Sequence, residues 1–195
     1  MGCESCHGGN ATTFESFQAH QDILNSRNPA SPVHRRNIPQ TCGACHTGQF
    51  VAFQDSGHFA LLQEGSQDIP VCTTCHENVG ARLLSPKGLA KQCSKCHGEG
   101  EIAPRPEYPV QGRQLLEGIR EVRTLLNEAE PLIRRVKEVT RREDLQYAYD
   151  QAEVPLIEAV LAGHSFIFER LEERLGVARR RAETLLERLA NPPPG

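Results

Sequence analysis

Apolar residues in the C-terminal half of the chain recur at alternating intervals of four and three positions. One series runs over residues 115–136 and a second over residues 157–189. This spacing is typical of helices that pack side by side. It predicts two long helices, the second over residues 155–190, with a turn in residues 140–155 and a kink or restart of the first helix at Pro131. An antiparallel helical hairpin is the simplest arrangement, and a parallel coiled-coil dimer is the alternative.

The first hundred residues have a different character. A proline-rich stretch, residues 102–110, separates them from a remainder that is rich in leucine, glutamate and arginine. Consecutive prolines suit neither helix nor sheet, so this stretch indicates a linker. We predict a domain over residues 1–104, a linker over 105–110 and the hairpin over 111–195. The expected fold class is mainly α, with short helices and loops in the first domain and little or no β-sheet.

Composition and charge narrow the function classes. Apolar residues make up 38% of the chain and aromatic residues 5%, with no Trp, which is thin for a core built from side chains alone. The net charge of −3 gives no sign of a nucleic-acid-binding surface, which usually shows as a basic patch. No run approaches the roughly 18 apolar residues of a membrane span. No export signal precedes Cys3, and we expect that segment to be absent from this sequence.

All eight cysteines fall in four C-x-x-C-H units, at residues 3–7, 42–46, 72–76 and 93–97. This is the signature of covalent haem attachment, because two thiols at this spacing can form thioether bonds with the two vinyl groups of one porphyrin. The next histidine then supplies the proximal ligand to iron. The sequence therefore predicts four haem c groups. The attachment residues are Cys3, Cys6, Cys42, Cys45, Cys72, Cys75, Cys93 and Cys96, and the proximal ligands are His7, His46, His76 and His97.

Paired cysteines also occur in tetrahedral zinc sites and in disulfide frameworks. Neither of these uses requires a histidine directly after every second cysteine. Histidine is a minor component of the chain, with 8 of 195 residues, so four chance placements at this position are improbable. Haem attachment is therefore preferred over both alternatives.

The sixth ligand of each iron is expected to be histidine. Met1 is the only methionine, and every cysteine is committed to a thioether bond. Once the proximal ligands are set aside, four histidines remain for four irons: His20, His34, His58 and His164. This match is arithmetic, and a ligand from a neighbouring subunit is the alternative. His34 lies between prolines beside Arg35 and Arg36, so a solvated loop histidine is its other interpretation.

His164 lies far downstream of the other histidines, in the apolar series of the second predicted helix. Leu161 and Phe168 are one turn away from it. A neutral histidine in such a place is costly unless its ring nitrogens have partners. It is either a core residue hydrogen-bonded across the hairpin or an axial ligand whose apolar neighbours cover a haem face. The count of four spare histidines for four irons favours the ligand.

These residues resemble the multihaem c-type cytochromes, specifically small tetrahaem electron carriers with bis-histidine haems. Residues 31–46, SPVHRRNIPQTCGACH, are similar to an element of that family that leads into an attachment motif. Residues 55–76 resemble its partner element, in which a helix-borne histidine precedes the next motif. The resemblance implies a distal-ligand role for His58 and for His20. It covers about residues 3–100, and packing four haems there implies that the porphyrins form most of the core.

The resemblance implies an electron carrier and not an enzyme, with single electrons passing along closely spaced low-spin haems. Without methionine ligands, low reduction potentials are expected. Thioether attachment takes place outside the cytoplasm, so a periplasmic or extracellular location is expected. The implied partners are a quinol-oxidising membrane complex, a terminal reductase or another cytochrome.

Two further hypotheses stay open. If one spare histidine is not a ligand, that iron has an open position, and the protein is a reductase of the nitrite or hydroxylamine type. Identical subunits can also stack into a filament or join a larger redox complex, with the regular helical half as the contact surface.

Overall fold

The structure is a computed structural model, and it describes residues 4–20, 25–76 and 84–191. The molecule is 71% helical, with ten helices and no strand among the described residues, so the predicted mainly α fold class is confirmed. The chain divides into two compact units, Met1–Leu83 and Leu84–Gly195. None of the described helices combines the length and apolarity that a bilayer crossing requires.

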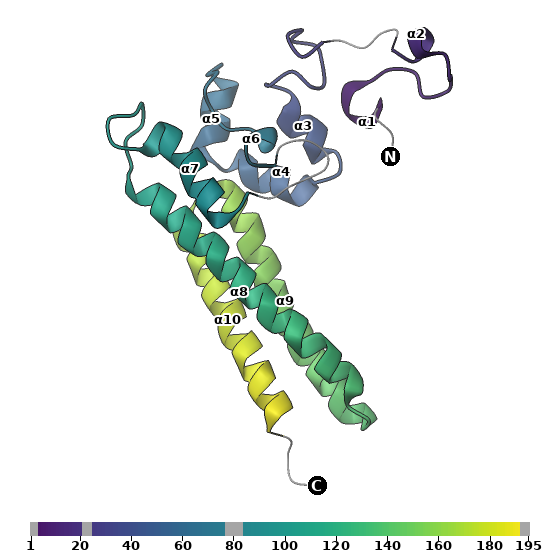
Figure 1. The fold of residues 1–195 in the computed structure, drawn as a ribbon, viewed down its shortest axis with the longest axis vertical. Coiled ribbons are helices and arrows are strands. Elements are labelled where there is room, and N and C mark those ends of the chain that lie inside the picture. Colours follow the sequence, from purple (N-terminus) through teal and green to yellow (C-terminus); the bar gives the residue numbers. More distant parts are fainter. Residues whose placement is uncertain (1–3, 21–24, 77–83, 192–195) are drawn as a thin grey trace. The chain divides into compact units, whose positions relative to one another are not determined.

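The N-terminal unit is built from short helices joined by turns (Figure 1). Its central part is an aromatic cluster, in which the Phe59 ring lies edge-on to Phe50 at 6.1 Å and to Phe53 at 5.6 Å. Apart from Pro39, only three apolar side chains of its described residues are buried, namely Phe53, Leu62 and Val71. The helices are α1 (Glu4–His7), α2 (Ser16–Ala19), α3 (Ile38–Gly43), α4 (Thr47–Gln54), α5 (Gly57–Gln63) and α6 (Cys72–His76).

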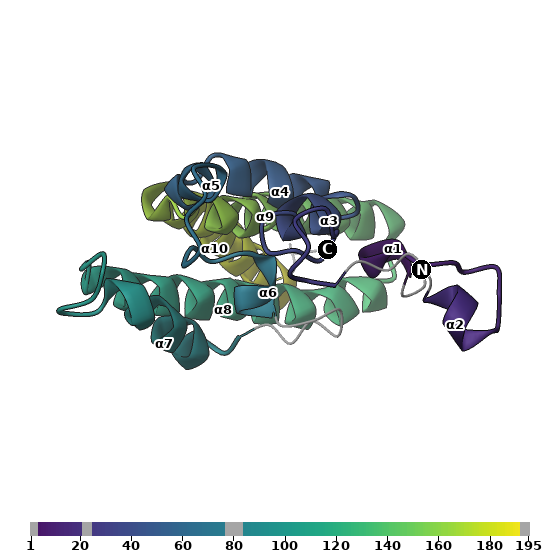
Figure 2. The ribbon, with the colours of Figure 1, turned by 90° about the horizontal axis from the view of Figure 1, so that it is seen from above.

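The C-terminal unit holds α7 (Pro86–His97), α8 (Glu107–Arg135), α9 (Val139–Ser165) and α10 (Phe168–Ala190). The last three form a bundle in which α9 runs antiparallel to both α8 and α10, and α7 lies beside α8 (Figures 1 and 2). α8 already begins at Glu107, inside the proline-rich stretch, because Pro109 stands in the first helical turn, where a backbone N–H has no intrahelical acceptor. The limits of the two domains and the linker are inferred from the change in composition along the chain, and they stay a prediction.

The bundle core consists of aliphatic side chains and alanines. Fifteen apolar residues of α8, α9 and α10 form one buried cluster. Five of them are alanines with no exposed surface: Ala129, Ala152, Ala159, Ala178 and Ala182. Side chains this small let helix backbones approach one another closely. Gly118 has the same effect, since a Cβ atom there would lie 2.7 Å from Leu175 Cδ2.

Two predicted helix limits are wrong. Residues 140–155 are not a turn, because the Glu138 carboxylate accepts hydrogen bonds from the backbone N–H groups of Thr140 and Arg141 and so begins α9. The predicted helix over residues 155–190 is two helices, separated at Phe166, which has a left-handed backbone with φ 56°. Pro131 lies inside α8, so the first helix does not restart there, and a kink at this residue stays a prediction. The C-terminal half is therefore an antiparallel bundle of three long helices and not a two-helix hairpin.

The predicted series of core-facing apolar residues, called the seam below, is also wrong along α9. Leu156 is 5% exposed and packs in the bundle core, whereas Ile157, a predicted seam residue, is 52% exposed. Ala159 and Ala162 continue the buried face. Along α10 the predicted seam holds, since Leu171, Leu175, Ala178, Ala182 and Leu185 are all buried.

Candidate haem sites

Short helices present the attachment motifs. α1 and α7 each end on a motif histidine, His7 and His97, and α6 is itself one complete motif. In a helical turn, residues i, i+3 and i+4 lie on one face, so both thiols and the imidazole of a motif point to the same side. The second motif spans the end of α3 and the start of α4, where His46 is the N-cap residue. Cys3 lies outside the described residues.

The described cysteines, Cys6 and both cysteines of each later motif, form no disulfide bonds. Within residues 4–20, 25–76 and 84–191, no three His, Cys, Asp or Glu side chains gather closely enough to hold a metal ion. The two thiols and one imidazole of each motif fit haem, whose porphyrin brings four equatorial nitrogens and needs from the protein only thiols and axial ligands.

The second and third motifs lie next to each other, since α3 packs against α6. The Cys72 thiol is hydrogen-bonded to the sulfur of Cys42, which lowers the pKa of Cys42 to about 7 despite its burial. The same hydrogen bond, together with burial, raises the pKa of Cys72. Burial raises the pKa of Cys75. The thiols of two attachment sites are thus within hydrogen-bonding distance of each other.

Three histidines share one hydrogen-bond pattern. The Nδ1 of His20 lies 2.7 Å from the Ser16 carbonyl oxygen, that of His97 lies 2.8 Å from Ala103 O, and that of His164 lies 2.8 Å from Val160 O. A carbonyl oxygen can only accept, so each Nδ1 carries the proton. The Nε2 atom then keeps its lone pair, which is the usual state of an imidazole that ligates a metal.

His34 has the opposite arrangement. Its Nδ1 accepts a hydrogen bond of 3.3 Å from the backbone N–H of Arg36. The neutral ring then carries its proton on Nε2, and this hydrogen bond must break before that atom can bind iron. His34 also lines a cavity of about 260 Å³ together with Arg35 and Arg36.

The remaining histidines lie at helix ends. His58 is half-buried in the first turn of α5, which Ser56 caps by accepting a 3.0 Å hydrogen bond from the backbone N–H of Phe59. His7 and His76 are half-buried, and His46 is exposed. Among the described residues, Nδ1 of His7 is buried without a hydrogen-bond partner.

In the C-terminal unit, an aromatic chain leads away from the fourth motif. The His97 ring meets Tyr108 of α8 edge-on at 5.3 Å, and Tyr108 meets Phe168 of α10 at 5.4 Å. The sequence interpretation missed Tyr108, because one tyrosine inside the predicted linker carries no periodic signal. Phe168 was recognised only as an apolar position in the helix seam.

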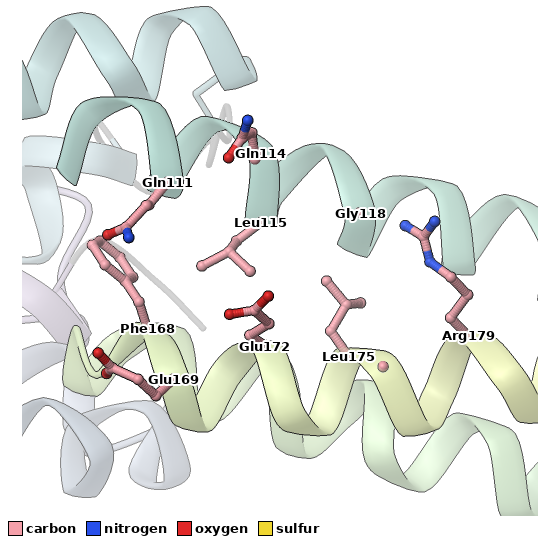
Figure 3. A pocket seen from close by; sticks show the side chains of 10 residues that line it. Gln111, Gln114, Leu115, Gly118, Phe168, Glu169, Glu172, Leu175 and Arg179 are labelled. Carbon is pink, nitrogen blue, oxygen red and sulfur yellow. The ribbon is translucent and has the colours of Figure 1, made fainter. Parts of the chain in front are cut away.

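A larger cavity of about 410 Å³ lies between α8 and α10, and Phe168 is at one end of it. Figure 3 shows Leu115, Glu172 and Leu175 facing this space. It is lined by no cysteine and no histidine. It is therefore not an attachment site.

Residues 29–98 match the family described as cytochrome c7 and related cytochrome c. The match supports a multihaem c-type cytochrome over these residues. No curated protein and no solved structure gives a match. The cytochrome match contains the second, third and fourth motifs, with His34 and His58, whereas the first motif, His20 and His164 lie outside it. Cytochromes of this family carry covalently bound haem and transfer electrons, and they are typically periplasmic or extracellular.

Proposed function

We propose that the protein is a tetrahaem electron carrier, with one haem c held by each C-x-x-C-H unit. The observation that carries this proposal is the set of four such units, whose described residues lie in helices or at helix ends, with three of the units inside the cytochrome match. Bound haem supplies one-electron chemistry through the Fe(III)/Fe(II) couple. The protein's own part is to fix each ring, ligate each iron and exclude substrates from it.

The side chains divide this work. Cysteine pairs hold the porphyrin edge, and the motif histidines bind the proximal face of iron. On the distal face we propose His20, His58 and His164, with His34 as the fourth. The Nδ1 hydrogen bonds of His20 and His164 fix the tautomer and ring orientation that ligation needs. The contact between Cys42 and Cys72 supports closely spaced attachment sites, which suit short electron-transfer steps.

Ligand binding tests the proposal. With both axial positions of every iron filled by histidine, the purified protein should be fully low-spin and should bind neither cyanide nor carbon monoxide. Resonance Raman and electron paramagnetic resonance spectra report the spin state, and a carbon monoxide titration reports open positions. A native protein that binds one carbon monoxide per chain would contradict the fully six-coordinate carrier.

The second candidate is a reductase with one open iron position, and the observation that favours it is the hydrogen bond from Arg36 to Nδ1 of His34. If this bond persists in the haem-loaded protein, one iron of the N-terminal unit lacks its predicted ligand. Nitrite titration of the wild type and of His34→Ala separates the candidates. A bis-histidine carrier gains a nitrite-binding haem only in the variant, whereas the reductase binds nitrite in both proteins.

We further propose a periplasmic or extracellular location and exchange of electrons with a membrane quinol oxidase, a terminal reductase or another cytochrome. A filament or a stable redox complex is compatible with the apolar residues exposed on the outer side of α9, Tyr147, Val154 and Ile157. Electron microscopy and light scattering of the native protein distinguish these assemblies from a monomer.

A further inference from the structure

The two compact units divide the histidines unevenly. Of the eight histidines, only His97 and His164 belong to Leu84–Gly195, and that unit contains one attachment motif, residues 93–97. The other unit, Met1–Leu83, contains three motifs, their three proximal histidines, and the three spare histidines His20, His34 and His58. Each unit therefore has as many spare histidines as motifs.

His97 and His164 lie at the same end of the bundle. His97 ends α7 and contacts Tyr108 in the first turn of α8. His164 is the penultimate residue of α9, which runs antiparallel to α8, so the end of α9 and the start of α8 lie at the same end of the bundle (Figure 1). Tyr108 also contacts Phe168, which lies four residues after His164 at the start of α10.

The surroundings of His164 suit a porphyrin. The buried face of α9 carries Leu156, Ala159 and Ala162, which pack in the bundle. Leu161 and Ile157, at i−3 and i−7 from His164, share its face of the helix instead, and Ile157 is 52% exposed. His164 is thus half-buried beside apolar side chains that the bundle core does not enclose. Both histidines also present Nε2, since each Nδ1 donates to a backbone carbonyl.

We propose that His97 and His164 are the two axial ligands of one haem, attached through Cys93 and Cys96 and held entirely by the C-terminal unit. This inference rests on the proposed haem-binding function. It makes the unit of α7 to α10 a monohaem module and leaves the other three haems to His20, His34 and His58. α9 is then part of a haem site, which the family match does not cover.

A double-variant experiment on the full chain tests the pairing. One variant is His164→Ala. The other, Cys93→Ala/Cys96→Ala, removes the fourth attachment site, and mass spectrometry should show three haems per chain. The readout is the number of carbon monoxide molecules bound per chain, together with the high-spin resonance signal. His164→Ala should add one binding haem to the wild type and none in the background that lacks the fourth haem.

Two outcomes overturn the pairing. If His164→Ala adds a binding haem in both backgrounds, His164 ligates a haem of another motif. If it adds none to the wild type, His164 is not a ligand. The test depends only on the number of carbon monoxide-binding haems that His164→Ala adds. A wild type that already binds carbon monoxide would therefore contradict the six-coordinate carrier, but the pairing could still be tested.

Matched controls exclude a folding artefact. Val154→Ala, on the same helix ten residues before His164 and 51% exposed, should leave every haem low-spin. His164→Met should restore a low-spin spectrum with sulfur ligation, which Ala cannot do. Far-ultraviolet circular dichroism should show equal helicity in all variants.

Discussion

Gly43 lies between the two cysteines of the second motif, and it is buried. A Cβ atom at this position would lie 2.6 Å from Cγ and 2.8 Å from Cβ of Phe50. Phe50 cannot move away at its own Cβ without moving α4 and its edge-on contact with Phe59. The motif therefore needs a glycine here for packing, although haem attachment itself accepts any residue at this place.

We predict that Gly43→Ala destabilises the N-terminal unit by about 1–3 kcal/mol through overpacking. Thermal unfolding, followed by the haem absorption, measures the change. Gly57→Ala is the matched control, because a Cβ atom there meets nothing within 4 Å. Equal stability of the two variants would show that the loop between α3 and α4 adapts to the added methyl group.

At the residue scale, the sequence predicts which residues attach haem better than it predicts the hydrogen-bond partners of those residues. Cysteines and histidines at a fixed spacing identify the attachment sites. The carbonyl partners of the ring nitrogens are not readable in advance, because Ala103 O reaches His97 only through the turn that follows α7. The hydrogen bond from Arg36 to His34 cannot be predicted either, because it joins residues two positions apart in an irregular turn.

At the scale of elements, the register of α9 decides which side chains stabilise the bundle. Leu156→Ala removes a buried side chain and should cost about 2–4 kcal/mol. Ile157→Ala, at the next residue, should cost less than about 1 kcal/mol, because the side chain is half in solvent. Urea unfolding followed by circular dichroism measures both variants. A larger loss of stability in Ile157→Ala than in Leu156→Ala would instead support the predicted series through Ile157 as the buried face of α9.

A second element-scale prediction concerns the crossing of α8 and α10. Gly176→Ala should stabilise the bundle by about 0.5–1 kcal/mol, because alanine favours helix and only Arg180 Nη1 lies nearby, at 3.5 Å. Gly118→Ala has the same helical gain but must displace the buried Leu175. It should be less stable than Gly176→Ala by about 1–2 kcal/mol. Urea midpoints of the two variants give the comparison, and equal midpoints would mean that Leu175 repacks freely.

The helix boundaries show what periodicity can and cannot predict. The helical class and the α10 seam follow directly from the spacing of apolar residues. The break at Phe166 does not, because the four-and-three spacing continues unchanged from His164 to Phe168 and Leu171. The left-handed backbone at Phe166 is unusual for an aromatic residue, and tertiary packing of α9 on α10 is what holds it.

At the scale of the whole molecule, the two units differ in how they are stabilised. The C-terminal unit has a cluster of fifteen buried apolar residues, whereas the described part of the N-terminal unit buries three. So few apolar contacts do not offset the conformational entropy of about eighty residues. The sequence suggested this through its low aromatic content, and the structure shows that the shortage lies in the N-terminal unit.

We predict that a chain expressed without haem keeps α8, α9 and α10 and loses ordered structure before residue 84. Hydrogen–deuterium exchange with mass spectrometry should show protection confined to the C-terminal unit. The haem-loaded protein, measured in parallel, should show protection in both units. Strong protection of α3 to α6 without haem would contradict a core formed by porphyrins.

The uneven core also has a consequence for maturation and turnover. The half with its own core can fold as soon as it is synthesised, whereas the other half stays accessible to the attachment machinery until its thiols have reacted. In a cell short of haem, proteases would remove the N-terminal half and spare the helical one. A stable C-terminal fragment of this protein would then report that cofactor supply, rather than synthesis of the chain, had failed.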